Sequence, residues 1–238
     1  TIHDIRYLED SDDASDGNWI ETVRAFSPTP DTSVRDLLSR DTLFNHLRTT
    51  IKKTVLRADM VITVSEFSKR RIIEKLGVPP EKVKVIYHGI GEHFVPQDKE
   101  AVNRVLKKYG IATPYILYTG KFEPLKNLGR LLEAFQKVSE HRDVRLVMAG
   151  PENWFYYVIR ERARQMKIED KILFTGFVTD GELTALYSGA SVFAFPSLYE
   201  GFGLPLLEAM ACGAPIVTSN VCSIPEVVSD AAVFADPY

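Results

Sequence analysis

The chain has 238 residues, a formal net charge of −3, and 45% hydrophobic and 26% charged residues, enough for two modest α/β domains. A nucleic-acid binder would carry a strong basic excess, which this composition excludes. The two cysteines, Cys212 and Cys222, give no disulfide framework and are typical of a reducing compartment. No apolar run of about 18 residues is present to span a membrane, and no signal peptide is visible, so we expect a cytoplasmic protein.

The first part of the chain predicts strands and helices in alternation. Apolar residues recur every four positions from Leu43 to Val55, which indicates a helix. Ser65 is a candidate N-cap, and Gly77 would end the helix that follows. Before these elements lies a polar surface loop over 9–40. The expected elements are a strand end over 2–5, a helix over 41–58, a strand over 60–64, a helix over 66–76 and a strand over 83–87.

The polar, proline-containing segment Gly91–Asp98 is the best domain boundary. Residues 1–94 are then the C-terminal part of one domain, and residues 95–238 make up a second. Strands are expected over 115–119, 144–149, 172–174, 192–195, 215–218 and 232–234, helices over 100–109, 128–138, 155–166, 182–186 and 204–212, and a turn or helix over 224–228. This strict alternation predicts a doubly wound parallel sheet. Because both ends of the chain adjoin apparent strands, we expect a fragment of a longer enzyme.

One stretch, FPSLYEGFGLPLLEAMACGAPIV over 195–217, concentrates unusual features. Glu200 and Glu208 flank a Gly-Phe-Gly hinge, and the next helix begins at Leu204 with proline second and closes at Gly213. The surrounding βαβ pattern places the hinge at the carboxyl edge of the sheet, where open α/β sheets bind ligands. Backbone amides of Gly201, Phe202, Gly203 and Leu204 could cradle a phosphate or sugar hydroxyls there.

The position of Glu208 has two interpretations. Its helix is apolar on every side, so we expect it to be buried, with the carboxylate in the first turn. The free amides of that turn could satisfy the carboxylate, helped by the helix dipole. Alternatively, Glu208 is presented to the hydroxyl groups of a ligand.

A second group of residues lies in TGKFEPLKNLGRLLEAF over 119–135. Asn127 is the expected N-cap of the helix, and Lys126 directly precedes it. A cation there opposes the helix dipole unless a phosphate is bound, and Lys121 opens the same loop. The alternative is a solvated loop in which Lys121 pairs with Glu123.

The remaining candidates give weaker signals. Phe177 and Val178 follow another expected strand and, from the residues alone, belong to the core. A lone histidine such as His3 is more often structural than catalytic, although Asp4 could orient it. The histidines have no metal-ligand spacing with acids or cysteines, so we expect no metal.

EGFGLPLLE, with FPSLY before it and EAMACGAPIV after it, resembles the E-x7-E motif of the retaining nucleotide-sugar glycosyltransferases of family four. The stretch ADMVITVSEFSKRRIIEKLGVPPEKVKVIYHGI is similar to the end of the N-terminal domain in that family. The resemblance covers most of the chain and is weakest over 9–40. It implies an α/β protein of the GT-B type, with two Rossmann-like doubly wound domains facing across a cleft and the N-terminal one incomplete.

The resemblance also implies roles for individual residues. Glu208 would hold the donor ribose hydroxyls, and Glu200 and His3 would lie beside the donor sugar. Lys126 matches the Lys-Asn of the family, whereas Lys121, after Gly120, stands where arginine is usual; both cations would grip the donor diphosphate. Lysine keeps the charge but loses the bidentate fork of arginine. Phe177 and Val178 would contact the nucleotide base.

The implied reaction transfers a hexosyl group, mannosyl among the options, from a nucleoside diphosphate sugar to an acceptor hydroxyl in glycan or glycolipid synthesis. It proceeds with retention, with no cofactor and no metal. The partners would be the nucleotide-sugar donor and a glycan or lipid-linked acceptor, with a peripheral membrane contact through basic helix faces as a minority alternative. Two rival functions stay open: a non-catalytic nucleotide-sugar-binding fragment, and a nucleotide-sugar epimerase on the same fold.

Overall fold

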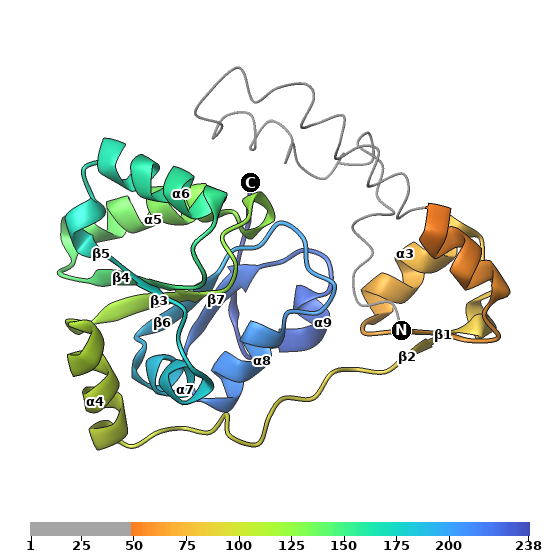
Figure 1. The fold of residues 1–238 in the computed structure, drawn as a ribbon, viewed down its shortest axis with the longest axis horizontal. Coiled ribbons are helices and arrows are strands. Elements are labelled where there is room, and N and C mark those ends of the chain that lie inside the picture. The colour runs from red at the N-terminus through yellow and green to blue at the C-terminus, as the bar shows by residue number, and fades with distance from the viewer. Residues whose placement is uncertain (1–48) are drawn as a thin grey trace. The chain divides into compact units, whose positions relative to one another are not determined.

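The computed structural model describes residues 49–238, which divide into two compact units (Figure 1). In the described range, unit 1 consists of residues 49–88 together with the loop Tyr199–Phe202. Unit 2 consists of Gly89–Leu198 and Gly203–Tyr238. The predictions on residues 1–48, including the role of His3 and the strand end over 2–5, lie outside the described residues.

The described part of unit 1 has a helix over 49–57, followed by β1 (Val61–Thr63), α3 (Glu66–Leu76), η3 (Pro80–Lys82) and β2 (Val83–Val85). The two strands pair in parallel, and α3 has the predicted bounds. The Ser65 hydroxyl accepts a hydrogen bond from the amide of Ser68 at 3.0 Å, and Gly77 ends the helix at φ +66°. Both caps were therefore predicted correctly. Strand β2 is two residues shorter than expected, and Ile86 and Tyr87 are exposed.

Unit 2 contains one six-stranded sheet in which every strand pair is parallel. The strand order is β5-β4-β3-β6-β7-β8; counted from β3 as the first strand, it reads 3-2-1-4-5-6, the order of dinucleotide-binding folds. This confirms the predicted doubly wound sheet. The strands are β3 (Tyr115–Thr119), β4 (Arg145–Ala149), β5 (Ile172–Gly176), β6 (Val192–Phe195), β7 (Ile216–Ser219) and β8 (Val233–Ala235). The helices are α4 (Lys99–Tyr109), α5 (Leu128–His141), α6 (Trp154–Gln165), α7 (Asp180–Gly189), α8 (Leu204–Ala211) and α9 (Ile224–Val228), with short turns η4 (Pro124–Lys126) and η5 (Glu169–Lys171).

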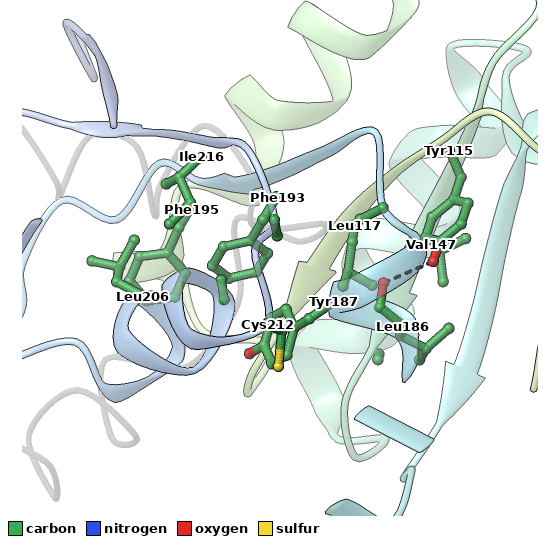
Figure 2. Packing of buried hydrophobic residues seen from close by; sticks show 14 of the residues in the cluster. Tyr115, Leu117, Val147, Leu186, Tyr187, Phe193, Phe195, Leu206, Cys212 and Ile216 are labelled. Atoms are coloured by element: carbon green, nitrogen blue, oxygen red, sulfur yellow. Dashed lines mark hydrogen bonds between the residues drawn. The ribbon is translucent and has the colours of Figure 1, made fainter. Parts of the chain in front are cut away.

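Helices cover both faces of this sheet (Figure 1). Side chains alternate along β3, so Tyr115 and Leu117 join one core cluster and Tyr118 joins the other. Helices α5 and α6 supply the second cluster, whereas α4, α7, α8 and α9 contribute to the first, part of which is drawn in Figure 2. Because β3 and β6 are buried on both faces, they read as continuous apolar runs in the sequence.

Two helices differ from their predictions in ways that affect the site. Helix α8 is not buried on every side: Leu204 is 38% exposed, although Leu206 and Ala209 are fully buried. Glu208 is the fifth residue of α8 and lies beyond its first turn. Helix α7 runs to Gly189, three residues past the predicted end, and therefore includes Tyr187.

Candidate functional site

The carboxyl ends of β3 and β6 define the candidate site of unit 2. These two strands are neighbours, and the strand order reverses between them. In doubly wound sheets, ligands bind in the crevice outside such a switch point. Strand β3 ends at Thr119 and leads directly into Gly120 and Lys121, whereas β6 ends at Phe195.

The loops after β3, β4 and β5 are held together at this edge by backbone hydrogen bonds. The amide of Gly120 donates to the carbonyl of Ala149, and the amide of Gly150 donates to the carbonyl of Gly176, each at 3.0 Å. A Cβ atom on Gly150 would lie 2.0 Å from the carbonyl oxygen of Gly120. Gly150 therefore permits the close approach that positions the loop carrying Lys121.

Replacing Gly150 with alanine is expected to destabilise the protein by about 1–3 kcal/mol, because the backbone of Gly120 must move to admit the methyl group. Chemical denaturation of the variant and the parent would measure the difference. The matched control is Gly181→Ala in α7, where a Cβ would meet no atom within 4 Å and a helical alanine is favoured. Equal effects of the two substitutions would contradict this account of Gly150.

Lys126 closes the η4 turn directly before the amino end of α5, as predicted. Its Nζ atom lies 5.5 Å from the centre of the Phe195 ring, which places it at the end of β6. The amide of Leu198 donates to the carbonyl of Leu125 at 2.8 Å and ties the two segments together. The Lys121 side chain is exposed and makes no ion pair with the described residues, so the alternative of a Lys121–Glu123 pair has no support.

Asn127 does not cap α5 in the predicted way. Its backbone is left-handed, with φ +57°, and its side chain makes no capping hydrogen bond. Instead, Nδ2 donates to the carbonyl of Pro237 at 2.9 Å. Its Oδ1 atom is buried and, like the buried Oγ of Ser197, has no hydrogen-bond partner among residues 49–238. Buried polar atoms normally have partners, so these two atoms are exceptions within the described range.

Glu208 is held by a tyrosine and not by helix amides. The Tyr187 hydroxyl donates to Oε2 of Glu208 at 3.0 Å, and the Thr119 Oγ1 lies 2.7 Å from the Tyr187 oxygen. The free amides of α8 belong to its first four residues, which precede Glu208. The expectation that these amides satisfy the carboxylate is therefore wrong. Through Tyr187, Glu208 is linked to the carboxyl end of β3.

The surroundings of Glu208 raise the pKa of its carboxyl group. Burial raises the pKa of the carboxyl above its ordinary value, and the negative charge of Asp180 adds to the effect. The hydrogen bond from Tyr187 and the nearby His93 act in the opposite direction on that pKa. His93 lies 3.6 Å from Asp180, measured from Nε2 to Oδ2.

Sequence reasoning missed Tyr187, Asp180 and His93. One signal could have corrected the start of α7: Thr179 and Glu182 form a capping box, which is readable as Thr-x-x-Glu before an apolar run. A helix begun at Asp180 would then extend naturally to Tyr187, one position beyond Leu186.

The loop Tyr199–Phe202 is described with unit 1, and its contacts lie there. The carbonyl of Gly201 accepts hydrogen bonds from the hydroxyls of Ser65 at 2.8 Å and Ser68 at 3.3 Å. The Phe202 ring packs on His88, with ring centres 5.3 Å apart. The neighbouring Glu200 is partly buried. Its sugar-binding role, and the amide cradle of Gly201 to Leu204, stay predictions.

Phe177 follows β5 at the same edge as Lys121 and is 78% exposed, so the interpretation as a core residue is wrong for this side chain. Val178 is partly buried against the first core cluster. The two residues therefore differ, and only Phe177 offers an uncovered aromatic face. Their role as base contacts stays a prediction.

The described range, residues 49–238, contains neither a group of metal ligands nor a membrane-spanning helix. No three acidic, histidine or cysteine side chains in it are grouped so that they could hold a metal ion. In the same range, no helix combines the length and the apolar character needed to cross a bilayer.

Comparison with known proteins identifies the family of the chain. Residues 84–238 match the family described as Glycosyl transferases group 1, and residues 31–93 match Glycosyltransferase Family 4. The chain is 37% identical over 195 residues to O-antigen chain mannosyltransferase B of Escherichia coli. The aligned region covers 81% of this chain and 51% of that protein. It thus spans about half the length of this curated relative.

Solved structures show the same fold. A glycosyltransferase from Rickettsia africae superposes with a TM-score of 0.71 at 24% identity, over 79% of this chain and 53% of that one. Anabaena HepE in complex with UDP-glucose superposes with a TM-score of 0.68 at 22% identity, over 76% and 50%. These likenesses show an α/β fold of the GT-B type, in agreement with the parallel sheets. By its sequence, and with a fold that agrees, the chain belongs to the glycosyl transferases of group 1.

Proposed function

We propose that the chain is the donor-binding part of a retaining glycosyltransferase that moves a hexosyl group from a nucleoside diphosphate sugar to an acceptor hydroxyl in glycan synthesis. Family membership supports the reaction class. The name of the Escherichia coli relative favours a mannosyl group, and the UDP-glucose bound to Anabaena HepE supports a nucleotide-sugar donor. The acceptor would be a glycan or a lipid-linked glycan.

The observation that carries the proposal is the link between Glu208 and the end of β3. Tyr187 bridges the Glu208 carboxylate and the Thr119 hydroxyl by contacts of 3.0 and 2.7 Å. Thr119 directly precedes Gly120 and Lys121, so the segment linked to Glu208 also leads into a basic residue at the carboxyl end of β3. A ligand with both hydroxyl groups and a diphosphate would use this combination.

The proposed roles follow from the charges that develop as the glycosidic bond breaks. Negative charge grows on the diphosphate, where Lys121, Lys126 and the amino end of α5 would stabilise it. Positive charge grows on the sugar ring, for which Glu200 and His3 are the proposed neighbours. Glu208 would accept hydrogen bonds from the ribose hydroxyls. Because no side chain is an evident covalent nucleophile, retention would come from substitution on the same face, assisted by the departing phosphate.

The setting is proposed to be cytoplasmic. Cys212 and Cys222 are free thiols in the structure, which agrees with a reducing compartment. A peripheral membrane contact through basic helix faces, with a lipid-linked acceptor, is the minority alternative.

Calorimetric titration with GDP, UDP, ADP and dTDP, followed by their hexose conjugates, tests the proposal directly. We expect one nucleoside diphosphate to bind in preference, and its sugar conjugate to donate to an added acceptor. Binding without transfer or hydrolysis would favour a nucleotide-sugar-binding module, and an epimerised donor sugar would indicate an epimerase. Absence of binding across the panel would refute the proposal.

Removing the ammonium group of Lys126 by substitution with alanine is expected to weaken nucleoside diphosphate binding by about tenfold to a hundredfold, because one charge-assisted hydrogen bond is lost. The unfolding midpoint should change little, since the side chain is only partly buried. Lys137→Ala, at an exposed position in α5, is the matched control and should leave binding unchanged. An unaltered affinity in Lys126→Ala would remove the diphosphate assignment.

A further inference from the structure

Tyr187 is a polar side chain in an apolar setting. It is 0% exposed, and its ring packs edge-on against Phe193 with ring centres 5.1 Å apart (Figure 2). Phe94 lies on another side at 6.4 Å. A phenylalanine would fill this volume without requiring partners for a hydroxyl group. The hydroxyl therefore needs an explanation beyond packing.

The protons in this group can be assigned from chemistry. A phenol carries one proton, and an ionised carboxylate can only accept, so Tyr187 donates to Oε2 of Glu208. Its oxygen must then accept from Thr119, whose hydroxyl lies 2.7 Å away. Burial raises the pKa of the Tyr187 phenol well above its ordinary value, so the phenol keeps its proton. The result is a one-directional chain from the end of β3 through α7 to α8.

We propose that Tyr187, itself held by Thr119, is a positioning residue that fixes the Glu208 carboxylate for binding of the donor hydroxyls. The inference rests on the proposed function, in which Glu208 binds the donor. A partly buried carboxylate on α8 would otherwise turn among its rotamers and lose its charge to protonation. The donated hydrogen bond engages one oxygen and leaves Oε1 to face the ligand.

Other groups also act on this carboxylate. Asp180 on α7 disfavours its charge, and His93, in the segment before α4, favours it. Cys212 follows α8, and burial raises the pKa of its thiol to about 11, so it stays neutral. Helix α9, the other helix packed on α8, carries one charged residue, Glu226. Among the described residues that act on Glu208, only Tyr187 is hydrogen-bonded to its carboxylate.

The test compares Tyr187→Phe with Tyr115→Phe. Tyr115 is equally buried in the same cluster, and its hydroxyl donates to the carbonyl of Leu186 at 2.7 Å, drawn as the dashed line in Figure 2. Each variant loses one buried hydrogen bond, but only Tyr187→Phe affects Glu208. Calorimetry would measure affinity for the preferred nucleoside diphosphate as a function of pH, and thermal unfolding would measure folding.

We expect Tyr187→Phe to bind the nucleoside diphosphate about tenfold more weakly than the parent, and Tyr115→Phe to bind it equally well. The loss of a donor also raises the pKa of Glu208 further. As the pH is lowered, Tyr187→Phe should therefore lose binding at a higher pH than the parent does. A merely structural role would lower the melting temperature of both variants without moving the pH profile.

Thr119→Val gives a second route to the answer if Tyr187→Phe does not fold. Removing the hydroxyl that donates to Tyr187 should weaken binding in the same direction by a smaller factor. The inference is overturned if Tyr187→Phe and Thr119→Val bind as the parent does, with the same pH profile. The proposed function still stands in that case, provided that the parent binds and Glu208→Ala does not. If the parent binds no nucleoside diphosphate, both are overturned.

Discussion

Substitution of Glu208 by alanine is expected to weaken binding of the donor nucleotide by about a hundredfold. A carboxylate that accepts hydrogen bonds from two hydroxyl groups contributes roughly 3 kcal/mol, and each 1.4 kcal/mol corresponds to a factor of ten. The substitution also leaves the buried Tyr187 hydroxyl without the acceptor to which it donates at 3.0 Å. Titration of the variant with the nucleoside diphosphate preferred by the parent would measure the effect.

The control for this substitution is Glu100→Ala on α4, where an exposed glutamate pairs with Arg104 at 3.0 Å. It removes the same charge from the same unit and should leave affinity unchanged. Glu208→Gln keeps an acceptor for Tyr187 and should lose less affinity than Glu208→Ala. A Glu208→Ala protein that binds as tightly as the parent would show that the ribose is held elsewhere.

Truncation of Phe193 to alanine is expected to lower the free energy of unfolding by about 3–5 kcal/mol, the usual effect of deleting a buried aromatic ring. Phe193 is 0% exposed in β6, which lies inside the sheet between β3 and β7. Its ring contacts Tyr187 at 5.1 Å and Phe195 at 5.7 Å between centres. The cavity would therefore open beside the tyrosine that holds Glu208. Chemical denaturation followed by circular dichroism would measure the loss.

Phe177→Ala is the matched stability control, because the same atoms are removed from a side chain that is 78% exposed. Surface substitutions of this kind usually change stability by no more than about 0.5 kcal/mol. A comparable loss in the two variants would contradict the core placement of Phe193.

The sequence predicted the elements of the fold well, because local rules determine them. Ser65 and Gly77 bound α3 where capping preferences place them, and six apolar runs became the six strands of one parallel sheet. Ends were less accurate where no cap signal was recognised, as at Gly189 in α7. Asn127 has the residue type of an N-cap, but its left-handed backbone directs the side chain to Pro237.

The residues of the candidate site also differ in whether the sequence alone can identify them. Lys126 and Glu208 could be singled out as candidates because their motifs are contiguous in sequence. Tyr187 could not, since it meets Glu208 over 21 positions and Thr119 over 68. In the sequence, a buried tyrosine on α7 looks the same as any apolar core residue. The partner of its hydroxyl is decided by the packing of α7 against α8, which periodicity does not encode.

The membership of Tyr199–Phe202 in unit 1 affects the order in which the protein can fold. The carbonyl that Ser65 and Ser68 share belongs to Gly201, and residues 89–198 of unit 2 are translated between them. During synthesis, the two serine hydroxyls therefore cannot form these hydrogen bonds until residues 89–198 of the other unit have been translated. Unit 1 is thus completed only after residues 89–198 of unit 2 have been made, and the rest of unit 2, Gly203–Tyr238, follows it.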